Sequence, residues 1–221
     1  MKTMITRFTK FALIWLLVFG VPLLHSAMAE GSDTEKYAWS ENAGWVNFRQ
    51  DHGGATVHET HLSGYAWAEN IGWIKLGGTG SGESTPCYAN DSATNWGVNR
   101  VSDTGELSGY AWRGTAGWIN FNSADLQGKK VTVDSDGNSE GYAWSENAGW
   151  IHFKNTDIPY IVRIILAGDV NDSGKVDLGD AIDALKVVAD LPSDVNVYAD
   201  VNDDDRISIP EAVYALEEAG K

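Results

Sequence analysis

The sequence has a single cysteine, Cys87, among its 221 residues. One cysteine excludes an intramolecular disulfide, so packing or bound metal must stabilise the fold. We expect Cys87 to be a buried, inert thiol, and a link between two chains is the alternative.

Long apolar runs are also scarce, since only Phe11 to Leu24 forms one. It follows a basic start and precedes Ala27-Met28-Ala29, a small-x-small cleavage site. We therefore predict a secretory signal peptide at residues 1–29 and a secreted chain, either free or attached to the cell surface. The run is shorter than the roughly 20 residues that span a membrane. An uncleaved anchor is the alternative, and no membrane contact is expected after cleavage.

Basic residues are few, with 16 Lys and Arg against 31 Asp and Glu, a net charge of −15. Three of these bases and none of the acids lie before residue 30, which leaves 13 against 31, or −18. From Gly168 onward there are 14 acids and 4 bases. This balance excludes nucleic acid and anionic membranes as partners and favours a bound cation.

Four copies of one aromatic phrase are present, and they indicate a repeat architecture. The copies begin at Tyr37, Tyr65, Tyr110 and Tyr142. They read YAWSENAGWVNF, YAWAENIGWIKL, YAWRGTAGWINF and YAWSENAGWIHF.

Each copy predicts a β-hairpin, because aromatic and β-branched residues flank a polar turn that ends in Gly. A five-residue turn places Trp39 opposite Trp45, with Tyr37 on the same face. Ala38 and Val46 then point to the other face. The same pairing is expected for Trp67 with Trp73, Trp112 with Trp118, and Trp144 with Trp150.

Further strands are expected before the later copies, near Val57, at Val98 to Val101 and at Val131 to Val133. Each unit is then a three-stranded meander. The run Tyr160 to Leu166 is expected to supply the strand that the first copy lacks, protecting its edge. A glycine-rich stretch at 77–82 is expected to be a linker or surface loop.

The aromatic residues have two interpretations. Their regularity favours a core between stacked hairpins, because large aromatics dominate core burial. The alternative is an exposed surface that stacks on sugar rings.

Two sets of polar residues, the turn glutamates and a group of histidines, are candidate catalytic or metal sites. Glu41, Glu69 and Glu146 share one turn position, but the third copy has Gly114 there. We therefore predict no catalysis, since hydrolysis needs a defined carboxylate pair.

Three histidines lie between the first two copies, at His52, His58 and His61. We expect them to belong to a polar loop, and a transition-metal site is the alternative.

The C-terminal region contains two runs with the periodicity of EF-hand calcium loops, at 169–180 and 200–211. Gly174 and Asp205 occupy position six, where the loop turns sharply. Each run precedes an amphipathic helix, at 178–191 and 210–219. Hard oxygen ligands at this spacing select Ca²⁺, so two Ca²⁺ ions are predicted.

The region Gly168 to Lys221 resembles a type I dockerin module, which binds a cohesin module on another protein. The resemblance implies the first-loop ligands Asp169, Asn171, Ser173, Lys175 (through its carbonyl), Asp177 (through water) and Asp180. It implies the second-loop ligands Asp200, Asn202, Asp204, Arg206 (through its carbonyl), Ser208 (through water) and Glu211. It also implies partner contacts at Leu178, Gly179, Ile209 and Pro210. These last positions usually carry Ser or Thr, so any contact here is more apolar.

Together these patterns predict a multidomain protein with an all-β repeat domain of four aromatic hairpin or meander units at 30–167. A small α-helical, dockerin-like calcium module follows at 168–221. The expected function is non-catalytic: docking to a cohesin-like partner, with the β domain binding a ligand for which carbohydrate is favoured by the resemblance alone. The alternatives are a polysaccharide-degrading hydrolase or lyase and a structural subunit of a cell-surface assembly.

Overall fold

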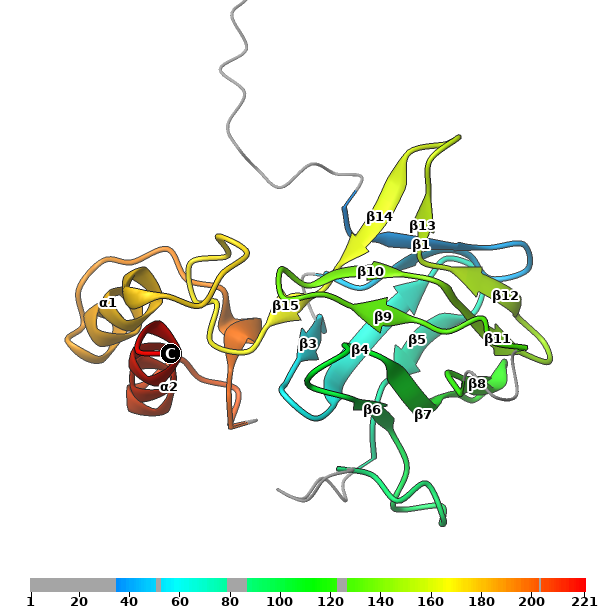
Figure 1. Ribbon diagram of the computed structural model, residues 1–221, viewed down its shortest axis with the longest axis horizontal. Coiled ribbons are helices and arrows are strands. Elements are labelled where there is room, and N and C mark those ends of the chain that lie inside the picture. The colour runs from blue at the N-terminus through cyan, green and yellow to red at the C-terminus, as the bar shows by residue number, and fades with distance from the viewer. Residues whose placement is uncertain (1–34, 51–52, 79–86, 123–126, 203) are drawn as a thin grey trace, which may run out of the picture. The chain divides into compact units, whose positions relative to one another are not determined.

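The structure is a computed structural model, and it describes residues 35–50, 53–78, 87–122, 127–202 and 204–221 (Figure 1). Residues Gly31–Lys221 form one compact unit. The signal peptide predicted at 1–29 and His52 lie outside the described residues. None of the helices in those ranges is long and apolar enough to cross a membrane.

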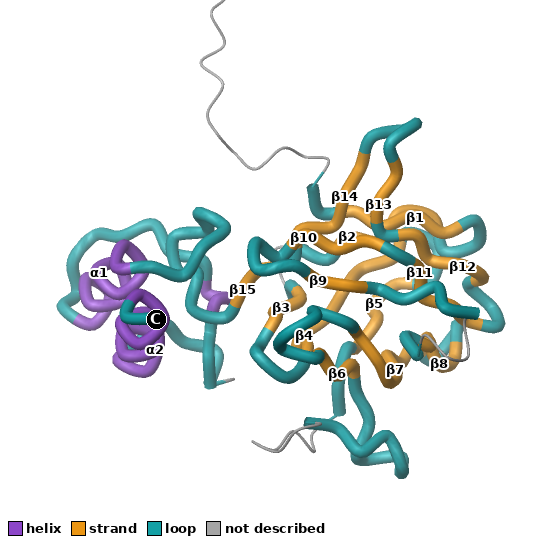
Figure 2. The backbone as a smooth tube through the Cα atoms, viewed as in Figure 1, coloured by secondary structure: helices purple, strands orange, loops and turns teal. Residues whose placement is uncertain are grey.

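Strands dominate the described chain, and helices appear only near its C-terminus (Figure 2). The strands are β1 Tyr37–Ser40, β2 Gly44–Asn47, β3 Ala55–Val57, β4 Leu62–Ala68, β5 Gly72–Lys75, β6 Val98–Arg100, β7 Leu107–Arg113, β8 Gly117–Asn120, β9 Thr132–Val133, β10 Asn138–Glu140, β11 Tyr142–Ser145, β12 Gly149–His152, β13 Lys154–Asn155, β14 Tyr160–Arg163 and β15 Ile165–Leu166. The helices are α1 Leu178–Val188, the 3₁₀-helix η1 Val197–Ala199 and α2 Ile209–Ala219. The coarser expectation, mostly β with a small helical part, is confirmed.

Eight of the strands close into an antiparallel barrel. The order around it is β4-β2-β1-β12-β11-β8-β7-β5, and β5 pairs again with β4. Neighbours along the chain pair as four hairpins, with Trp39 opposite Trp45 and Trp67 opposite Trp73. The expected pairing is therefore confirmed at every copy, since Trp112–Trp118 and Trp144–Trp150 are also opposed.

The tryptophans, however, do not form the core, and that expectation was wrong. Trp39 is 41% exposed, and Trp118 is 43% exposed. The opposite face lines the barrel, where Ala38 pairs with Val46 and both are buried. An eight-stranded barrel is only wide enough for side chains of modest size to fill it, so a ring of indoles does not fit inside.

The barrel interior is filled by alternating small and large side chains. It contains Ala38, Ala66, Ala111, Ala143, Val46, Ile74, Ile119, Ile151, Phe48, Leu76, Phe121 and Phe153, all buried. At each hairpin turn a glycine takes a positive φ, for example 73° at Gly44 and 74° at Gly117. This conformation is strained for other residues, which explains the glycine in every copy.

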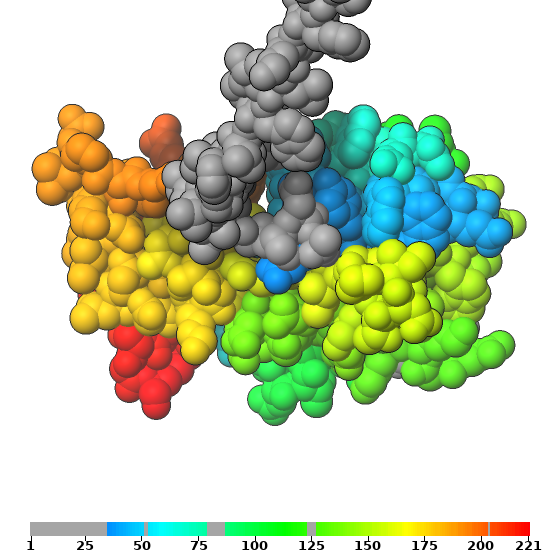
Figure 3. Space-filling view, turned by 90° about the horizontal axis from the view of Figure 1, so that it is seen from above, coloured from blue at the N-terminus to red at the C-terminus, as the bar shows by residue number. Residues whose placement is uncertain are grey.

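The extra strands pair where the sequence predicted strands before the later copies. β3 pairs with β4, β6 with β7, and β9 with β10, which leads directly toward β11. The run after the last copy divides into β14 and β15. Val162 in β14 makes an antiparallel bridge to Lys36, just before β1, and β15 pairs in parallel with β3. The segment around β13 and β14 lies beside the first hairpin in Figure 3 (yellow-green against blue).

A second, smaller core follows the barrel. It contains Ile165, Val170, Ala184, Ala199, Ile207 and Ala212. Helices α1 and α2 pack together, and their fully buried apolar residues are alanines: Ala181, Ala184, Ala212 and Ala215. The larger apolar residues of both helices remain about half exposed, which the amphipathic pattern did not predict.

Candidate functional site

The first acidic loop, 169–180, is organised around two buried carboxylates. Both oxygens of Asp169 accept backbone N–H groups, from Ser173 at 2.8 Å and from Gly174 at 2.8 Å. Asp180 accepts the N–H of Asn171 at 3.0 Å and that of Asp177 at 2.8 Å. The position-twelve carboxylate therefore joins the start of the loop to the start of α1, where Asp177 is the N-cap.

The second loop, 200–211, repeats this arrangement. Asp200 accepts the N–H groups of Asn202 at 2.9 Å and Asp205 at 2.6 Å. Buried Glu211 accepts the N–H of Val201 at 3.3 Å and of Ser208 at 2.5 Å. Position six has the expected left-handed backbone in both loops, with φ of 87° at Gly174 and 60° at Asp205.

Several candidate ligand oxygens already lie close together. Ser173 Oγ is 3.5 Å from Asp169 Oδ1 and 3.2 Å from the carbonyl oxygen of Lys175. In the second loop, the Asn202 side chain donates its amide N–H to Asp204 Oδ2 at 3.2 Å, which places these two candidate ligand side chains next to each other. Among the described residues, no three His, Cys, Asp or Glu side chains are gathered as a metal site. The loops also offer amide, hydroxyl and carbonyl oxygens, which are ligands that Ca²⁺ accepts.

Burial makes the negative charge of these carboxylates costly. It raises the pKa of Asp169 to about 6, and it raises the pKa of Asp180 and of Asp200 as well. Asp169 is 1% exposed and Asp180 is fully buried, yet among the described residues no Lys or Arg forms an ion pair with either. A divalent cation would supply the missing positive charge, so the residues present fit calcium.

The two helices present matching apolar stripes to solvent. Leu178, Ile182 and Leu185 on α1 are 56%, 48% and 45% exposed. The residues 31 positions later are Ile209, Val213 and Leu216 on α2, exposed by 49%, 47% and 49%. The contact residues implied by the resemblance follow this pattern, because Leu178 and Ile209 are exposed while Gly179 and Pro210 are half-buried. Four residues of the stripes were not predicted as partner contacts, namely Ile182, Leu185, Val213 and Leu216. The 31-residue offset between the two helices is nevertheless visible in the sequence.

Arginines of the β region hold the first acidic loop, 169–180. Arg163 Nη2 donates to Asp172 Oδ1 at 3.0 Å and to the Asp172 carbonyl at 3.2 Å. Arg49 also forms an ion pair with the Asp172 carboxylate. Asp172 is at loop position four, which is not a ligand position, so these contacts leave the ligand set intact.

The outer surface of the barrel carries one aromatic group on each hairpin. In the first, Trp39 and Trp45 meet edge to face with centroids 4.9 Å apart, and Tyr37 lies 5.9 Å from Trp45. Equivalent groups surround Trp73, Trp118 and Trp150. These exposed Trp and Tyr side chains favour the alternative interpretation of the aromatic residues, an exposed surface that stacks on sugar rings.

The hairpin turns are linked around one end of the barrel by side-chain hydrogen bonds. Asn70 donates to the Asn42 carbonyl at 3.0 Å, and Ser40 donates to the Ala148 carbonyl at 2.6 Å. Ser145 donates to the Ala116 carbonyl at 2.8 Å. Arg113 and Thr115 of the third turn complete the ring by donating to the Ile71 carbonyl.

This ring gives the turn residues a structural explanation. Glu69 Oε2 accepts the N–H of Trp45 at 3.2 Å, so at least one turn glutamate bonds to the neighbouring hairpin. Arg113 stands where the first and last copies have serine and makes the equivalent bond. The departure in the third copy therefore preserves the ring.

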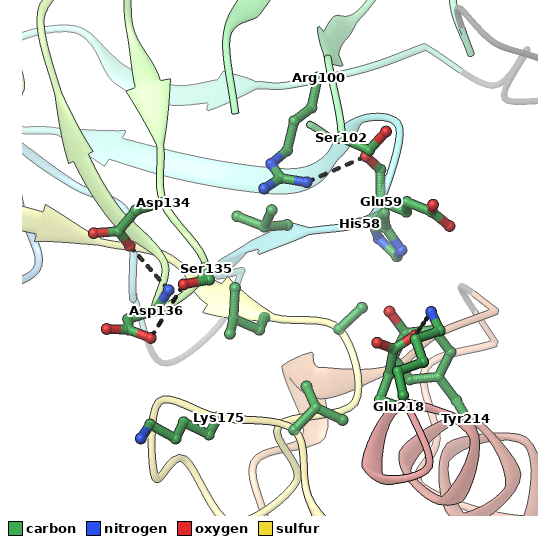
Figure 4. Close-up of a pocket in the computed structure, with 15 residues that line it drawn as sticks. His58, Glu59, Arg100, Ser102, Asp134, Ser135, Asp136, Lys175, Tyr214 and Glu218 are labelled. Atoms are coloured by element: carbon green, nitrogen blue, oxygen red, sulfur yellow. Dashed lines mark hydrogen bonds and ion pairs between the residues drawn. The ribbon is translucent and has the colours of Figure 1, made fainter. Parts of the chain in front are cut away.

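A cavity of about 530 Å³ lies beside His58 (Figure 4). His58 is buried and lines the cavity with Glu59 and Arg100, and its ring stacks on His61 at 4.4 Å. His58 Nε2 lies 2.8 Å from Ser63 Oγ. Arg100 Nη1 donates to the Glu59 carbonyl at 3.3 Å, and burial lowers the pKa of Arg100. His58 is therefore not in a solvated loop, and among the described residues no group of three His, Cys, Asp or Glu side chains includes these two rings.

The side chain of Cys87 is buried, as expected. Comparison with known proteins gave no match to a family model, to a curated protein or to a solved structure. The functional argument therefore depends on the residues of this chain.

Proposed function

We propose that this chain is a secreted, non-catalytic binding protein whose C-terminal module takes up two Ca²⁺ ions and docks onto a cohesin-like partner. The strongest support for the calcium is the pair of buried position-one and position-twelve carboxylates in each loop, which no Lys or Arg in the described chain neutralises. The loops hold these carboxylates through backbone N–H groups, as a calcium loop requires.

Docking through the helices is supported by the two exposed apolar stripes. An exposed row of large apolar side chains is costly for a soluble surface unless a partner covers it. The stripes recur at the same positions of both helices, so each could offer the same contact. The proposed occupant is a cohesin-like module, and the contacts would be apolar because Leu178 and Ile209 replace the usual Ser or Thr.

The β region is proposed to be the ligand-binding part, built from four units of an internal repeat. Its exposed aromatic groups support binding of polysaccharide, because the apolar faces of sugar rings stack on indole and phenol rings. The turn ring supports a non-catalytic role, since Glu69, one of the three turn glutamates that a hydrolase interpretation would need, accepts a structural hydrogen bond from the N–H of Trp45.

Calorimetric titration of Ca²⁺ into the chelator-treated mature chain tests the calcium proposal. We expect two sites in the wild type and one site each in Asp169→Ala and Asp200→Ala. Glu217→Ala, an exposed acid on α2, is the control and should keep both sites. A wild-type chain that binds no Ca²⁺ would refute the proposal.

Docking is tested by passing calcium-loaded chain over immobilised cohesin modules. We expect Ile182→Asp combined with Val213→Asp to abolish retention while leaving the calcium stoichiometry unchanged. Retention that survives this double change would place the contact elsewhere.

A further inference from the structure

We propose that the third hairpin and the loop before it form a binding site for one sugar unit of a neutral polysaccharide. This inference rests on the proposed binding role of the β region, but it does not depend on the calcium loops. The site is a cavity of about 370 Å³ lined by Asn90, Asp91, Ser92, Trp96, Tyr110 and Trp118. A volume of this size lies within the range of small-ligand pockets.

Three aromatic rings supply the apolar surface of the cavity. Trp118 is 43% exposed although Trp96 lies 5.3 Å away at 77° and Tyr110 lies 6.0 Å away at 67°. The steep angles between the rings give the cavity aromatic surfaces in more than one orientation. The C–H faces of a pyranose ring suit such walls.

The polar wall comes from a loop that is fixed before any ligand binds. Asn90 has a left-handed backbone with φ of 56°, and its side chain accepts the N–H of Gly97 at 3.0 Å and donates to the Tyr88 carbonyl at 3.3 Å. Asn95 accepts the N–H of Ala89 at 2.9 Å and donates its own N–H to Ser92 Oγ at 3.1 Å. A fixed loop loses little conformational entropy on binding.

The chemistry of this wall selects a neutral, hydroxyl-rich ligand. Asp91 is exposed on the loop, and a carboxylate accepts strong hydrogen bonds from hydroxyl groups. Ser92 can add a hydroxyl donor. No Lys or Arg lines this cavity among the described residues, and Asp91 repels carboxylates and sulfates. Acidic polysaccharides are therefore excluded.

The other three hairpins lack this combination, although their aromatic groups match. Trp45 is covered by Tyr160 at 5.2 Å, and the Lys129 ammonium lies 4.5 Å above Trp150. Gly53 lies against Trp73, where an added Cβ would be 3.0 Å from the indole. Only at the third hairpin of the described chain does a polar loop stand beside an exposed indole to form such a cavity. The interval of 45 residues between the second and third copies provides this loop.

Calorimetry on the calcium-loaded mature chain tests the proposal with soluble β-1,4-linked glucan, xylan and mannan oligosaccharides. We expect saturable binding of at least one of them. Trp96→Ala should weaken it at least about fivefold through the lost ring, and Asp91→Asn about fivefold through the weaker acceptor. The control is Ile158→Ala, which removes an exposed apolar side chain that belongs to none of the aromatic groups and should change the affinity by less than about twofold.

Three results would overturn the site: no saturable binding of any neutral oligosaccharide up to about 10 mM, equal losses in Trp96→Ala and Ile158→Ala, or tighter binding of oligogalacturonate or cationic chitosan oligomers. The calcium stoichiometry, measured on the same samples, separates this outcome from failure of the calcium module. Intact calcium binding without glycan binding refutes the sugar site and the polysaccharide-binding role of the β region, whereas glycan binding that Trp96→Ala does not weaken refutes the site alone.

Discussion

Arg163 and Asp172 join the barrel region to the first calcium loop, with Arg163 Nη2 3.0 Å from Asp172 Oδ1. Arg163 belongs to β14, which pairs with β10 and bridges to the residue before β1. The loop is therefore attached to the sheet at Asp172, which lies in the sequence between Asp169 at position one and Gly174 at position six. The attachment is polar and half-buried, so it should couple the two regions energetically.

Arg163→Ala should reduce this coupling. We expect Ca²⁺ to raise the melting temperature of the β region in the wild type, and the increase to shrink in the variant as about 1 kcal/mol of interaction is lost. Differential scanning calorimetry with and without Ca²⁺ measures this. Lys154→Ala, which breaks the exposed pair with Glu140, is the control and should leave the increase unchanged. Equal calcium effects in Arg163→Ala and wild type would contradict the coupling.

Removal of calcium should unfold the two helices and leave the barrel folded. The only apolar residues that the helices bury fully are alanines, and no Lys or Arg of the described residues forms an ion pair with the buried carboxylates of the loops that begin them. Far-UV circular dichroism should therefore lose its helical signal on addition of chelator and recover it with excess Ca²⁺. Near-UV signals from the barrel tryptophans should change little. Unchanged helicity in chelator would show that the module folds without metal.

The two faces of the hairpins should differ in their contribution to stability. Ile119→Ala removes a fully buried side chain from the barrel interior and should cost about 2–5 kcal/mol. Trp112→Ala removes an outward ring that is 37% exposed and should cost about 1–2 kcal/mol, through lost contact with Trp118. Urea unfolding of both variants compares them. A larger loss for Trp112→Ala would mean that the indoles carry the core after all.

The difference between these faces marks the limit of the sequence argument. Alternation along each strand and the length of the turn fix Trp39 opposite Trp45 and Ala38 opposite Val46, so the register was predictable. Which face is inward depends on closure of the sheet and on the width of an eight-stranded barrel, and neither is a local property. The regular recurrence of the tryptophans in all four copies favoured a position in the core, but the narrow interior of the barrel does not accommodate them.

The functional residues divide in the same way. The backbone of the two acidic loops was predictable, including the left-handed sixth position of each, because the spacing of polar side chains within twelve residues determines the loop geometry. Binding of Ca²⁺ by these loops stays a prediction. The exposure of the apolar stripes at Ile182 and Val213 was not predictable. A helical pattern shows which residues share one face of a helix, but not whether another part of the protein covers that face. The loop containing Asn90 has no periodicity, and its packing beside Trp96 and Trp118 appears only in three dimensions.

Arg113 should be the most important member of the turn ring, because it spans the weakest join of the barrel. Strands β5 and β7 share a single register pair, Lys75 with Trp112, whereas the other joins between hairpins have two. Arg113 and Thr115 both donate to the Ile71 carbonyl across this join. Arg113→Ala should therefore destabilise the barrel by about 1–3 kcal/mol, since the lost bond comes from a charged donor.

Arg113→Lys distinguishes hydrogen-bond geometry from charge. Lysine keeps the positive charge but lacks the Nε–H group with which Arg113 donates to the Ile71 carbonyl. We therefore expect Arg113→Lys to restore less than half of the lost stability. Glu41→Ala, at an exposed turn position of the first hairpin, is the control and should change stability by less than about 0.5 kcal/mol. Urea unfolding followed by circular dichroism measures all three variants. If Arg113→Ala is as mild as Glu41→Ala, the single-pair join between β5 and β7 holds without the ring, and the arginine in the third copy needs another explanation.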